Sequence, residues 1–258
     1  MASDAAAAES PAARQPKPLF KRLEPLNPTR HQGLRLDRTG RNYRFAGAVS
    51  AVPLALSEFA ACGVAYPIVF SAGPEPMPLA VLGYQPDENL FVEPDGSWAA
   101  GRYVPWYVRC YPFAVLDGNE PGSPVACLDA EGAGIGPLTG DLLLEAGELS
   151  PMLQEILRFC MGYHRALAET RELGKALEGA GLLTRHAATI ALGAERKPVQ
   201  LSGFWAVDAE KFQALPDKTF LAWRRKGLLG AVYQHLHSLH CWPALSLAAA
   251  RKLDRRAG

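Results

Sequence analysis

The feature that most constrains the fold is an amphipathic stretch that begins at Ser150. Ser150 is a favourable N-cap residue, and Pro151 suits the first helical position because its missing N–H has no helical partner there. Large apolar residues then recur every three or four positions, at Leu153, Ile156, Leu157, Cys160, Tyr163 and Leu167. This spacing predicts a long helix that continues to about Leu177 and ends at Gly179 or Gly181.

The chain before this helix has short apolar runs separated by turns. The runs of strand length are residues 19–26, 66–70, 79–84, 89–92, 111–116 and 125–129. Pro94-Asp95-Gly96 predicts a turn, because proline presets φ and glycine allows a positive φ. Residues 53–62 predict a short helix, with Ser50 as its N-cap and Gly63 after its end.

The chain after the long helix begins with a β-hairpin pattern, residues 187–192 and 199–207. Asp208 and Pro216 each precede a short helical segment, and a last helix is expected over residues 228–253, broken or kinked at Pro243. We therefore predict an α+β fold: a mostly antiparallel sheet in the N-terminal half plus a C-terminal β-hairpin, packed by two long helices.

Composition predicts one folded unit after a tail. Residues 1–18 are rich in Ala and Pro and are expected to form a disordered tail. Residues 19–258 are expected to form a single domain, because neither half alone offers a balanced two-layer core; the alternative is a boundary near residue 148.

Charge and cysteine usage exclude several classes of protein. The 27 basic and 26 acidic residues give a formal net charge of +1, which argues against a nucleic-acid partner. Five scattered cysteines without a C-x-x-C pair argue against a disulfide framework, a zinc ribbon and a thioredoxin-like site. The N-terminus lacks a signal-peptide pattern and no apolar window of about 20 residues occurs. We expect a cytoplasmic protein without a transmembrane segment, and signal-independent export stays open.

The densest candidate site is the segment 102–111, with two arginines and four aromatic rings. Arginine offers a planar fork for a carboxylate or phosphate, and aromatic rings offer rigid contact area. If a short helix starts at Tyr103, then Trp106 and Arg109 follow at intervals of three residues. Arg102, Tyr103, Trp106 and Arg109 are therefore the predicted residues for an anionic or peptide ligand. The alternative is that the rings belong to the core and the arginines pair with carboxylates.

Histidines near the C-terminus form the second candidate. His237, His240 and Cys241 share one helix face at i, i+3 and i+4, a spacing that suits a transition metal. The sequence supplies neither a fourth ligand nor an H-E-x-x-H motif. Satisfied or solvated histidines are the favoured interpretation, and no metal or other cofactor is predicted.

Catalytic patterns are weak elsewhere in the chain. The run Gly132 to Gly136 fails the dinucleotide pattern because Pro137 stands at the third glycine position. No G-x-S-x-G motif occurs. Cys160 and His164 are i, i+4 neighbours on the long helix, but Cys160 lies on its apolar face, which favours a buried, unreactive thiol. Carboxylates such as Glu58, Asp87, Glu88 and Asp129 lie too far apart in the sequence to suggest an acid/base pair. No catalytic residue is predicted.

Several segments in order resemble the SapC family. They are PLNPTRHQGLRL (25–36), AVPLALSEFAACGVAYPIVF (51–70), ENLFVEPDGSWAAGRYVPWYVRCYPF (88–113), LSGFWAVDAEKFQALPD (201–217) and LLGAVYQHLHSL (228–239). The resemblance extends from about Leu19 to about Leu239 and carries over no catalytic residue. It favours a local structural role for His235. Residues 129–150 are shorter and richer in glycine than the acidic stretch of the family, so the resemblance carries over no role for acidic residues there.

The family name implies a link to surface-layer assembly or secretion, and the genes that accompany its members imply peptide or nutrient handling at the cell envelope. We therefore expect a non-enzymatic binding or accessory protein with a protein or peptide partner of the envelope. The alternatives are an enzyme that modifies a peptide or amino acid, with or without a metal at His235, His237 or His240, and a purely structural oligomer component.

Overall fold

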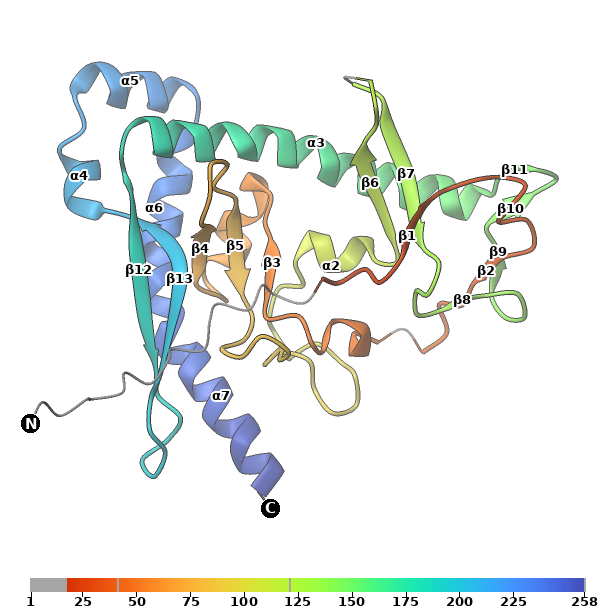
Figure 1. Ribbon diagram of the computed structural model, residues 1–258, viewed down its shortest axis with the longest axis horizontal. Helices are drawn as coiled ribbons and strands as arrows, with labels where there is room; N and C mark the ends of the chain where they lie inside the picture. Colours follow the sequence, from red (N-terminus) through yellow and green to blue (C-terminus); the bar gives the residue numbers. More distant parts are fainter. Residues whose placement is uncertain (1–17, 41, 121, 258) are drawn as a thin grey trace, which may run out of the picture.

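The structure, a computed structural model, describes residues 18–40, 42–120 and 122–257 (Figure 1). The predicted tail therefore lies outside the described residues apart from Pro18. The strands are β1 (Leu23–Pro25), β2 (Arg35–Leu36), β3 (Ala51–Pro53), β4 (Ile68–Ser71), β5 (Pro78–Val81), β6 (Phe113–Asp117), β7 (Pro124–Asp129), β8 (Ile135–Gly136), β9 (Asp141–Leu142), β10 (Leu144–Glu145), β11 (Glu148–Leu149), β12 (Leu183–Ile190) and β13 (Val199–Val207). The helices are α1 (Phe59–Cys62), α2 (Trp106–Cys110), α3 (Pro151–Gly179), α4 (Ala209–Gln213), α5 (Asp217–Arg225), α6 (Leu228–Ser238) and α7 (Trp242–Ala257), with 3₁₀ turns η1 (Arg44–Ala46), η2 (Leu56–Glu58) and η3 (Leu239–Cys241).

The largest sheet has five antiparallel strands in the order β12-β13-β4-β5-β3. The C-terminal hairpin is therefore not a separate unit: β13 extends the N-terminal strands by pairing Phe204 with Ser71 and Trp205 with Phe70. Other N-terminal strands form the smaller sheets β1-β7-β6 and β8-β2-β9. The α+β class with antiparallel sheets is confirmed, while the N-terminal strands divide among several sheets instead of forming one.

Two local predictions in the N-terminal half are wrong. Residues 51–53 form strand β3 against β5, so the helical turns begin later, at Leu56, and Ser50 does not cap them. Residues 89–92 form no strand and make only an isolated bridge between Val92 and Trp98. Among the described residues, no continuous strand lies beside residues 89–92, so no regular ladder forms. The predicted turn at Pro94-Asp95-Gly96 is present: the Asp95 carboxylate accepts from the Ser97 amide at 2.8 Å, and the Ala99 amide donates back to the Phe91 carbonyl at 2.8 Å.

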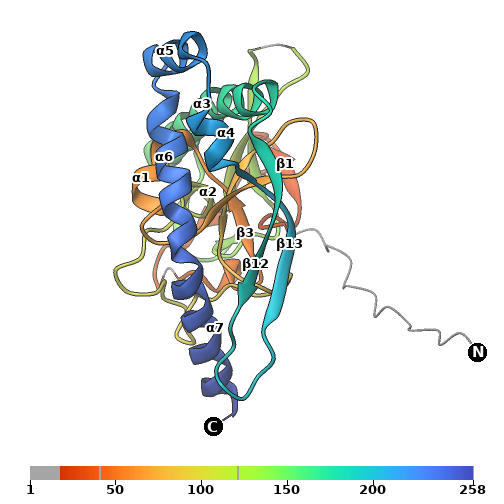
Figure 2. The same cartoon turned by 90° about the vertical axis from the view of Figure 1, so that its left-hand side faces the viewer.

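The helices predicted from residue 150 onward are confirmed closely. The Ser150 hydroxyl caps α3 by accepting from the Leu153 amide at 3.3 Å, and α3 runs along most of the long axis of the molecule in Figure 1. The Asp208 carboxylate caps α4 in the same way. Helices α6 and α7 form a nearly continuous rod beside β12 and β13, interrupted at η3 just before Pro243 (Figure 2). No helix in the described part of the chain is both long and apolar enough to cross a membrane.

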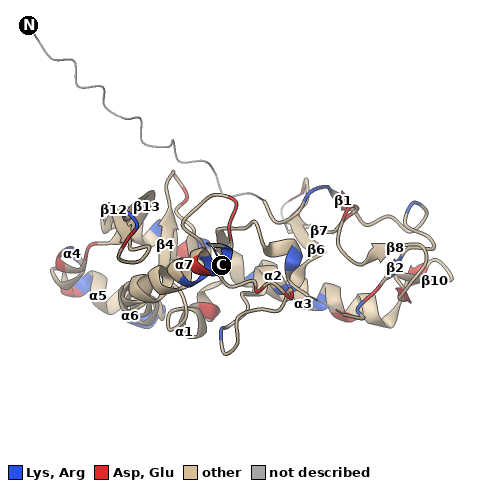
Figure 3. Cartoon of the chain, turned by 90° about the horizontal axis from the view of Figure 1, so that it is seen from below, with Lys and Arg blue, Asp and Glu red and all other residues tan. Residues whose placement is uncertain are grey.

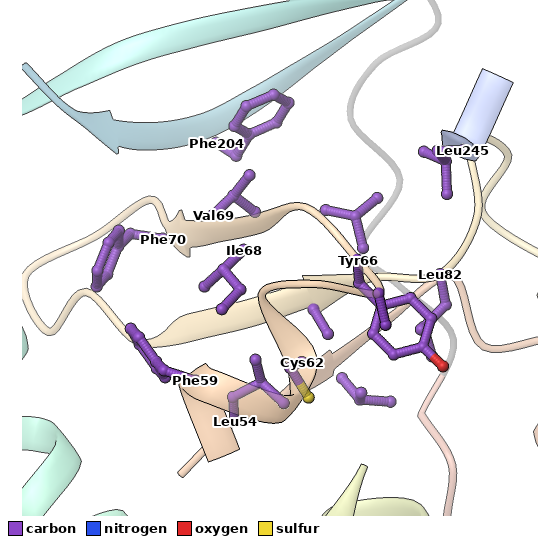
Figure 4. Packing of buried hydrophobic residues seen from close by; sticks show 14 of the residues in the cluster. Leu54, Phe59, Cys62, Tyr66, Ile68, Val69, Phe70, Leu82, Phe204 and Leu245 are labelled. Atoms are coloured by element: carbon purple, nitrogen blue, oxygen red, sulfur yellow. The ribbon is translucent and has the colours of Figure 1, made fainter. Parts of the chain in front are cut away.

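The main core surrounds β4 and is built from both halves of the chain (Figure 4). Tyr66, Phe59 and Phe70 are fully buried there, and Phe204 and Leu245 from the C-terminal elements are buried beside them. The Tyr66 hydroxyl donates to the Tyr103 carbonyl at 2.6 Å and accepts from the Trp98 indole at 2.9 Å. These bonds fasten the chain before α2 to the core, which matters because that chain carries the candidate site.

One glycine of α3 makes a close approach that predicts an unusual mutational effect. A Cβ built at Gly174 would overlap the Pro76 carbonyl oxygen, in the loop between β4 and β5. Glycine-to-alanine changes inside helices normally stabilise by about 0.5–1 kcal/mol. Gly174→Ala should instead lower the free energy of unfolding by about 1–3 kcal/mol, because the backbone must move apart. Chemical denaturation measures the change.

Gly230→Ala in α6 is the matched control, because nothing lies within 4 Å of the Cβ it would gain. It should be neutral or stabilising by about 0.5–1 kcal/mol. Equal effects of the two substitutions would contradict the close approach of α3 to Pro76.

Candidate ligand-binding cavity

Helix α2 starts later than predicted. Pro105 occupies its N-cap position and Trp106 its first helical position, so Arg102 and Tyr103 lie on the extended chain before it. The spacing argument from Tyr103 is therefore wrong, whereas Trp106 and Arg109 remain one turn apart on α2. A cis peptide joins Tyr111 to Pro112 directly after the helix.

A buried carboxylate, Glu58, holds this segment in place. Its Oε1 accepts from the Trp106 amide at 2.6 Å, and its Oε2 accepts from the Ala55 amide at 2.9 Å. The Tyr103 hydroxyl also bonds to it, and the Arg109 charge acts on it. Burial raises the pKa of Glu58, and these hydrogen bonds partly offset the rise. One carboxylate thus links η2 to both Tyr103 and Arg109.

Glu58 was not among the predicted site residues, although the sequence carries one local signal for its role. A glutamate three residues after a helix N-cap commonly reaches back to the N-cap amide, as Glu58 does to Ala55. The bond to Trp106 bridges 48 residues and leaves no local pattern. The other carboxylates that were set aside also have structural partners: Asp129 accepts from the Lys21 and Arg22 amides, and Glu88 pairs with Arg256 at 3.0 Å.

A cavity of about 930 Å³ lies beside this segment. Arg102, Tyr103 and Arg109 line it, and Trp106 does not. The rest of the lining comes from residues 36–40, 42–43 and 45, from Val104, from residues 110–113, from Ala133 and Gly134, and from the first turns of α3. The volume lies within the range of about 300–1,000 Å³ that is usual for ligand sites. Three of the four predicted residues therefore meet in one cavity.

Trp106 has a packing role instead. Its ring lies 5.3 Å from Phe159 and 5.7 Å from Tyr163, both on α3. Gly162 makes this approach feasible, because a Cβ there would come within 3.1 Å of the indole. Trp106 thus fixes α2 on α3 and positions Arg109 from behind the cavity wall.

The glycine-rich run after β7 also belongs to the cavity wall. Gly134 has a positive φ of 83°, and a Cβ there would come within 2.7 Å of the Asp37 carbonyl oxygen. The neighbouring Ala133 amide donates to the Tyr111 hydroxyl at 2.9 Å. The glycines thus let the chain pass close to residues 36–37. Apart from the number of glycines, nothing in the sequence indicated that this run lines a cavity.

The charges around the cavity are mixed. Figure 3 shows basic and acidic residues interspersed over the face that it presents, without an extended area of one sign. Arg38 on the lining pairs with Asp141 at 3.1 Å. The Arg109 guanidinium carbon lies 4.7 Å from the centre of the Phe159 ring, a cation–π geometry. Arg102 donates to the Ala65 carbonyl at a long 3.4 Å.

The histidine cluster lies elsewhere, where α6 passes into η3. The His237 and His240 rings are exposed and 5.9 Å apart. The Cys241 thiol instead donates to the Gly63 carbonyl at 3.4 Å, and burial raises its pKa. Within the described ranges, no three His, Cys, Asp or Glu side chains come together in a metal-binding arrangement.

The thiol–histidine pair is not arranged for nucleophilic attack. His164 Nε2 lies 3.0 Å from the Asp117 carboxylate, while Cys160 Sγ points to the backbone oxygens of Cys110 and Phe113. The bond with the Cys160 thiol and burial both raise the pKa of Cys110. A raised pKa disfavours the thiolate, which is the reactive form.

Comparison with known proteins completes this description. No curated protein and no solved structure is detectably similar to the chain. The family model described as SapC matches residues 26–245, which include Arg102, Tyr103, Arg109 and Glu58. Because this match extends over well more than half of the 258 residues, the chain belongs to the SapC family.

Proposed function

We propose that this protein is a non-enzymatic binding or accessory protein that acts from the cytoplasm on a protein or peptide partner of the cell envelope. Its role is in secretion, surface-layer assembly or receptor-linked uptake. The observation that carries the proposal is the convergence of Arg102, Tyr103 and Arg109 on one cavity of about 930 Å³. Membership of the SapC family supports a link to the envelope, which the family name implies.

The chemistry of the cavity supports binding. Arginine guanidinium groups form charge-assisted hydrogen bonds with carboxylates, and half-buried aromatic rings supply contact area that costs little conformational entropy. Glu58 and Tyr66 hold the Tyr103 segment from beneath, so the wall is preorganised by buried hydrogen bonds. Preorganised walls favour affinity because less conformational freedom is lost on binding.

The proposal predicts that partner capture depends on the two arginines. The tagged chain should capture an envelope or secretion protein from a lysate of its native cells, with the amounts read by quantitative mass spectrometry. Arg102→Gln combined with Arg109→Gln should reduce capture at least about tenfold, because hydrogen bonds to charged groups contribute about 1.5–3 kcal/mol each.

Arg158→Gln is the matched control, since Arg158 is exposed on α3 and lies outside the cavity lining. It should capture the same partner in the same amount. Full capture by the double variant, with circular dichroism showing that it is folded, would disprove the cavity as the binding site.

A further inference from the structure

A basic surface on α5 takes part in neither the cavity nor the core. Helix α5 forms a corner of the molecule in both views (Figures 1 and 2). Its Trp223 side chain is only 6% exposed and belongs to the main core, so this side of the helix packs inward. In a helix with about 3.6 residues per turn, Lys218, Leu221 and Arg225 lie on the opposite side, and all three are exposed.

Leu221 lies at the centre of this exposed side, with cations around it. Its side chain is 41% exposed. Lys218 precedes it by three residues, and Arg224 and Arg225 follow it by three and four, so all three cations are its neighbours on the helix surface. Lys226 is exposed at the C-cap of the helix. We call Leu221 and these four basic residues the α5 face.

Neither ion pairing nor helix stability accounts for the α5 face. None of the ion pairs among the described residues includes any of its four cations. With Asp217 as the single carboxylate in residues 217–226, the four cations give this segment a net charge of +3. Cations near a helix C-terminus favour the helix dipole, but Lys218 lies in the first turn, where a cation is unfavourable. The neighbouring helix α4 does not change the balance, because Glu210 and Lys211 offset each other.

We propose that the α5 face binds the surface of a membrane that contains anionic lipids. Each Lys or Arg near such a surface raises the partition constant about fivefold, because the lipid headgroups are negatively charged. An exposed leucine between the cations can enter the boundary between headgroups and acyl chains. A nucleic-acid backbone would attract the cations equally but offers no apolar surface to Leu221.

This surface is separate from the candidate cavity, because the described lining of the cavity contains no residue of α5. The inference therefore goes beyond the proposed function and does not depend on it. Four cations and one leucine give a weak, reversible attachment, far from the insertion of a membrane-spanning helix. Such an attachment raises the local concentration of the protein beside a membrane.

The test is co-sedimentation of the full chain with lipid vesicles. One set of vesicles contains equal parts of phosphatidylglycerol and phosphatidylethanolamine, and the other contains only phosphatidylcholine, which has no net charge. The protein should sediment with the anionic vesicles and stay in solution with the neutral ones. Raising the salt concentration from about 0.1 M to about 1 M should release it, because the screening length falls from about 10 Å to about 3 Å.

Two variants with the same change in net charge test the position of the cations. The first neutralises the α5 face and should lower the partition constant at least about 100-fold: Lys218→Gln, Arg224→Gln, Arg225→Gln and Lys226→Gln. The control neutralises four exposed basic residues elsewhere and should stay within about threefold of the parent, because distant charges are screened: Arg158→Gln, Arg165→Gln, Arg185→Gln and Lys197→Gln. Circular dichroism checks that both variants are folded.

A second pair of variants tests the apolar contact. Leu221→Gln keeps all four cations and should lower the partition constant about three- to tenfold, because the leucine no longer leaves water. Leu247→Gln is the matched control: Leu247 is 52% exposed on α7, at the other end of the rod that α6 and α7 form (Figure 1), and its loss should leave binding unchanged.

The outcomes separate this inference from the proposed function. Equal binding to both kinds of vesicle, binding to neither, or full binding by the variant with the neutralised α5 face overturns the membrane inference. The variant with Arg102→Gln and Arg109→Gln should bind vesicles like the parent, since its changes lie in the cavity. Loss of the envelope partner by that variant supports the proposed function whatever the vesicles show.

Discussion

Replacing Glu58 with alanine should lower the free energy of unfolding by about 3–5 kcal/mol, because breaking a buried charged network leaves its other members unpaired. The Ala55 and Trp106 amides would each lose their acceptor, at 2.9 and 2.6 Å in the folded chain. The Arg109 charge would lose its nearby opposite charge as well. Urea unfolding followed by circular dichroism measures the loss.

Two controls make this result specific. Glu58→Gln keeps the shape and one acceptor oxygen, so it should lose only about 1–3 kcal/mol, in the range for one unsatisfied buried group. Glu169→Ala, at an exposed position of α3, should stay within about 0.5 kcal/mol of the parent. A loss below about 1 kcal/mol for the alanine variant would show that the two amides have other acceptors.

Lowering the pH from about 6.5 to about 4 should remove about 3 kcal/mol of stability through His235 alone, since each pKa unit corresponds to about 1.4 kcal/mol. Burial lowers the pKa of His235 from 6.5 to about 4. Its Nε2 accepts from the Val207 amide at 3.0 Å, so protonation there would both break that bond and bury a charge. The unfolded chain takes up the proton at the ordinary pKa and the folded chain does not. The contribution is therefore fully present above pH 6.5 and is lost as the pH falls to about 4.

The measurement is the free energy of unfolding across pH 4 to 8 for the parent and for His235→Gln. Glutamine keeps an oxygen acceptor for the Val207 amide but does not titrate. Between pH 7 and pH 4, the free energy of unfolding of the parent should therefore fall by about 3 kcal/mol relative to that of His235→Gln. His240→Gln, at an exposed position, should follow the parent curve. Parallel curves for the parent and His235→Gln would show that the ring is not held neutral.

Elements with local signals were predicted from the sequence, and non-local arrangements were not. The start of α3 follows from two adjacent residues, Ser150 and Pro151, and the starts of α4 after Asp208 and of α5 after Pro216 are equally local. The order of the five-stranded sheet depends on pairing Phe204 with Ser71, which no window of neighbouring residues contains. Residues 89–92 have the composition of a strand, but no partner strand in the described chain lies beside them. Composition alone therefore predicted a strand that does not form.

The candidate site was likewise predicted only where its residues are close together in the sequence. Arg102, Tyr103 and Arg109 stand out as a cluster in the sequence and do meet in the cavity. Trp106 belongs to the same cluster, but its direction depends on α3, whose Gly162 leaves room for its ring. The opposite wall, from residues 36–40, 42–43 and 45 and from α3, is distant in the sequence and was found only from the fold.

The place of β13 in the sheet has a consequence for synthesis of the chain. Strand β4 pairs on one side with β5, which follows it closely, and on the other side with β13, more than a hundred residues later. At about 5–20 residues per second, translation leaves that side of β4 without its neighbour for roughly 10 s. During this interval the nascent chain exposes an unpaired edge rich in apolar side chains, Ile68 to Phe70. Release of a soluble, unaggregated product therefore depends on what shields that edge until residue 207 has left the ribosome.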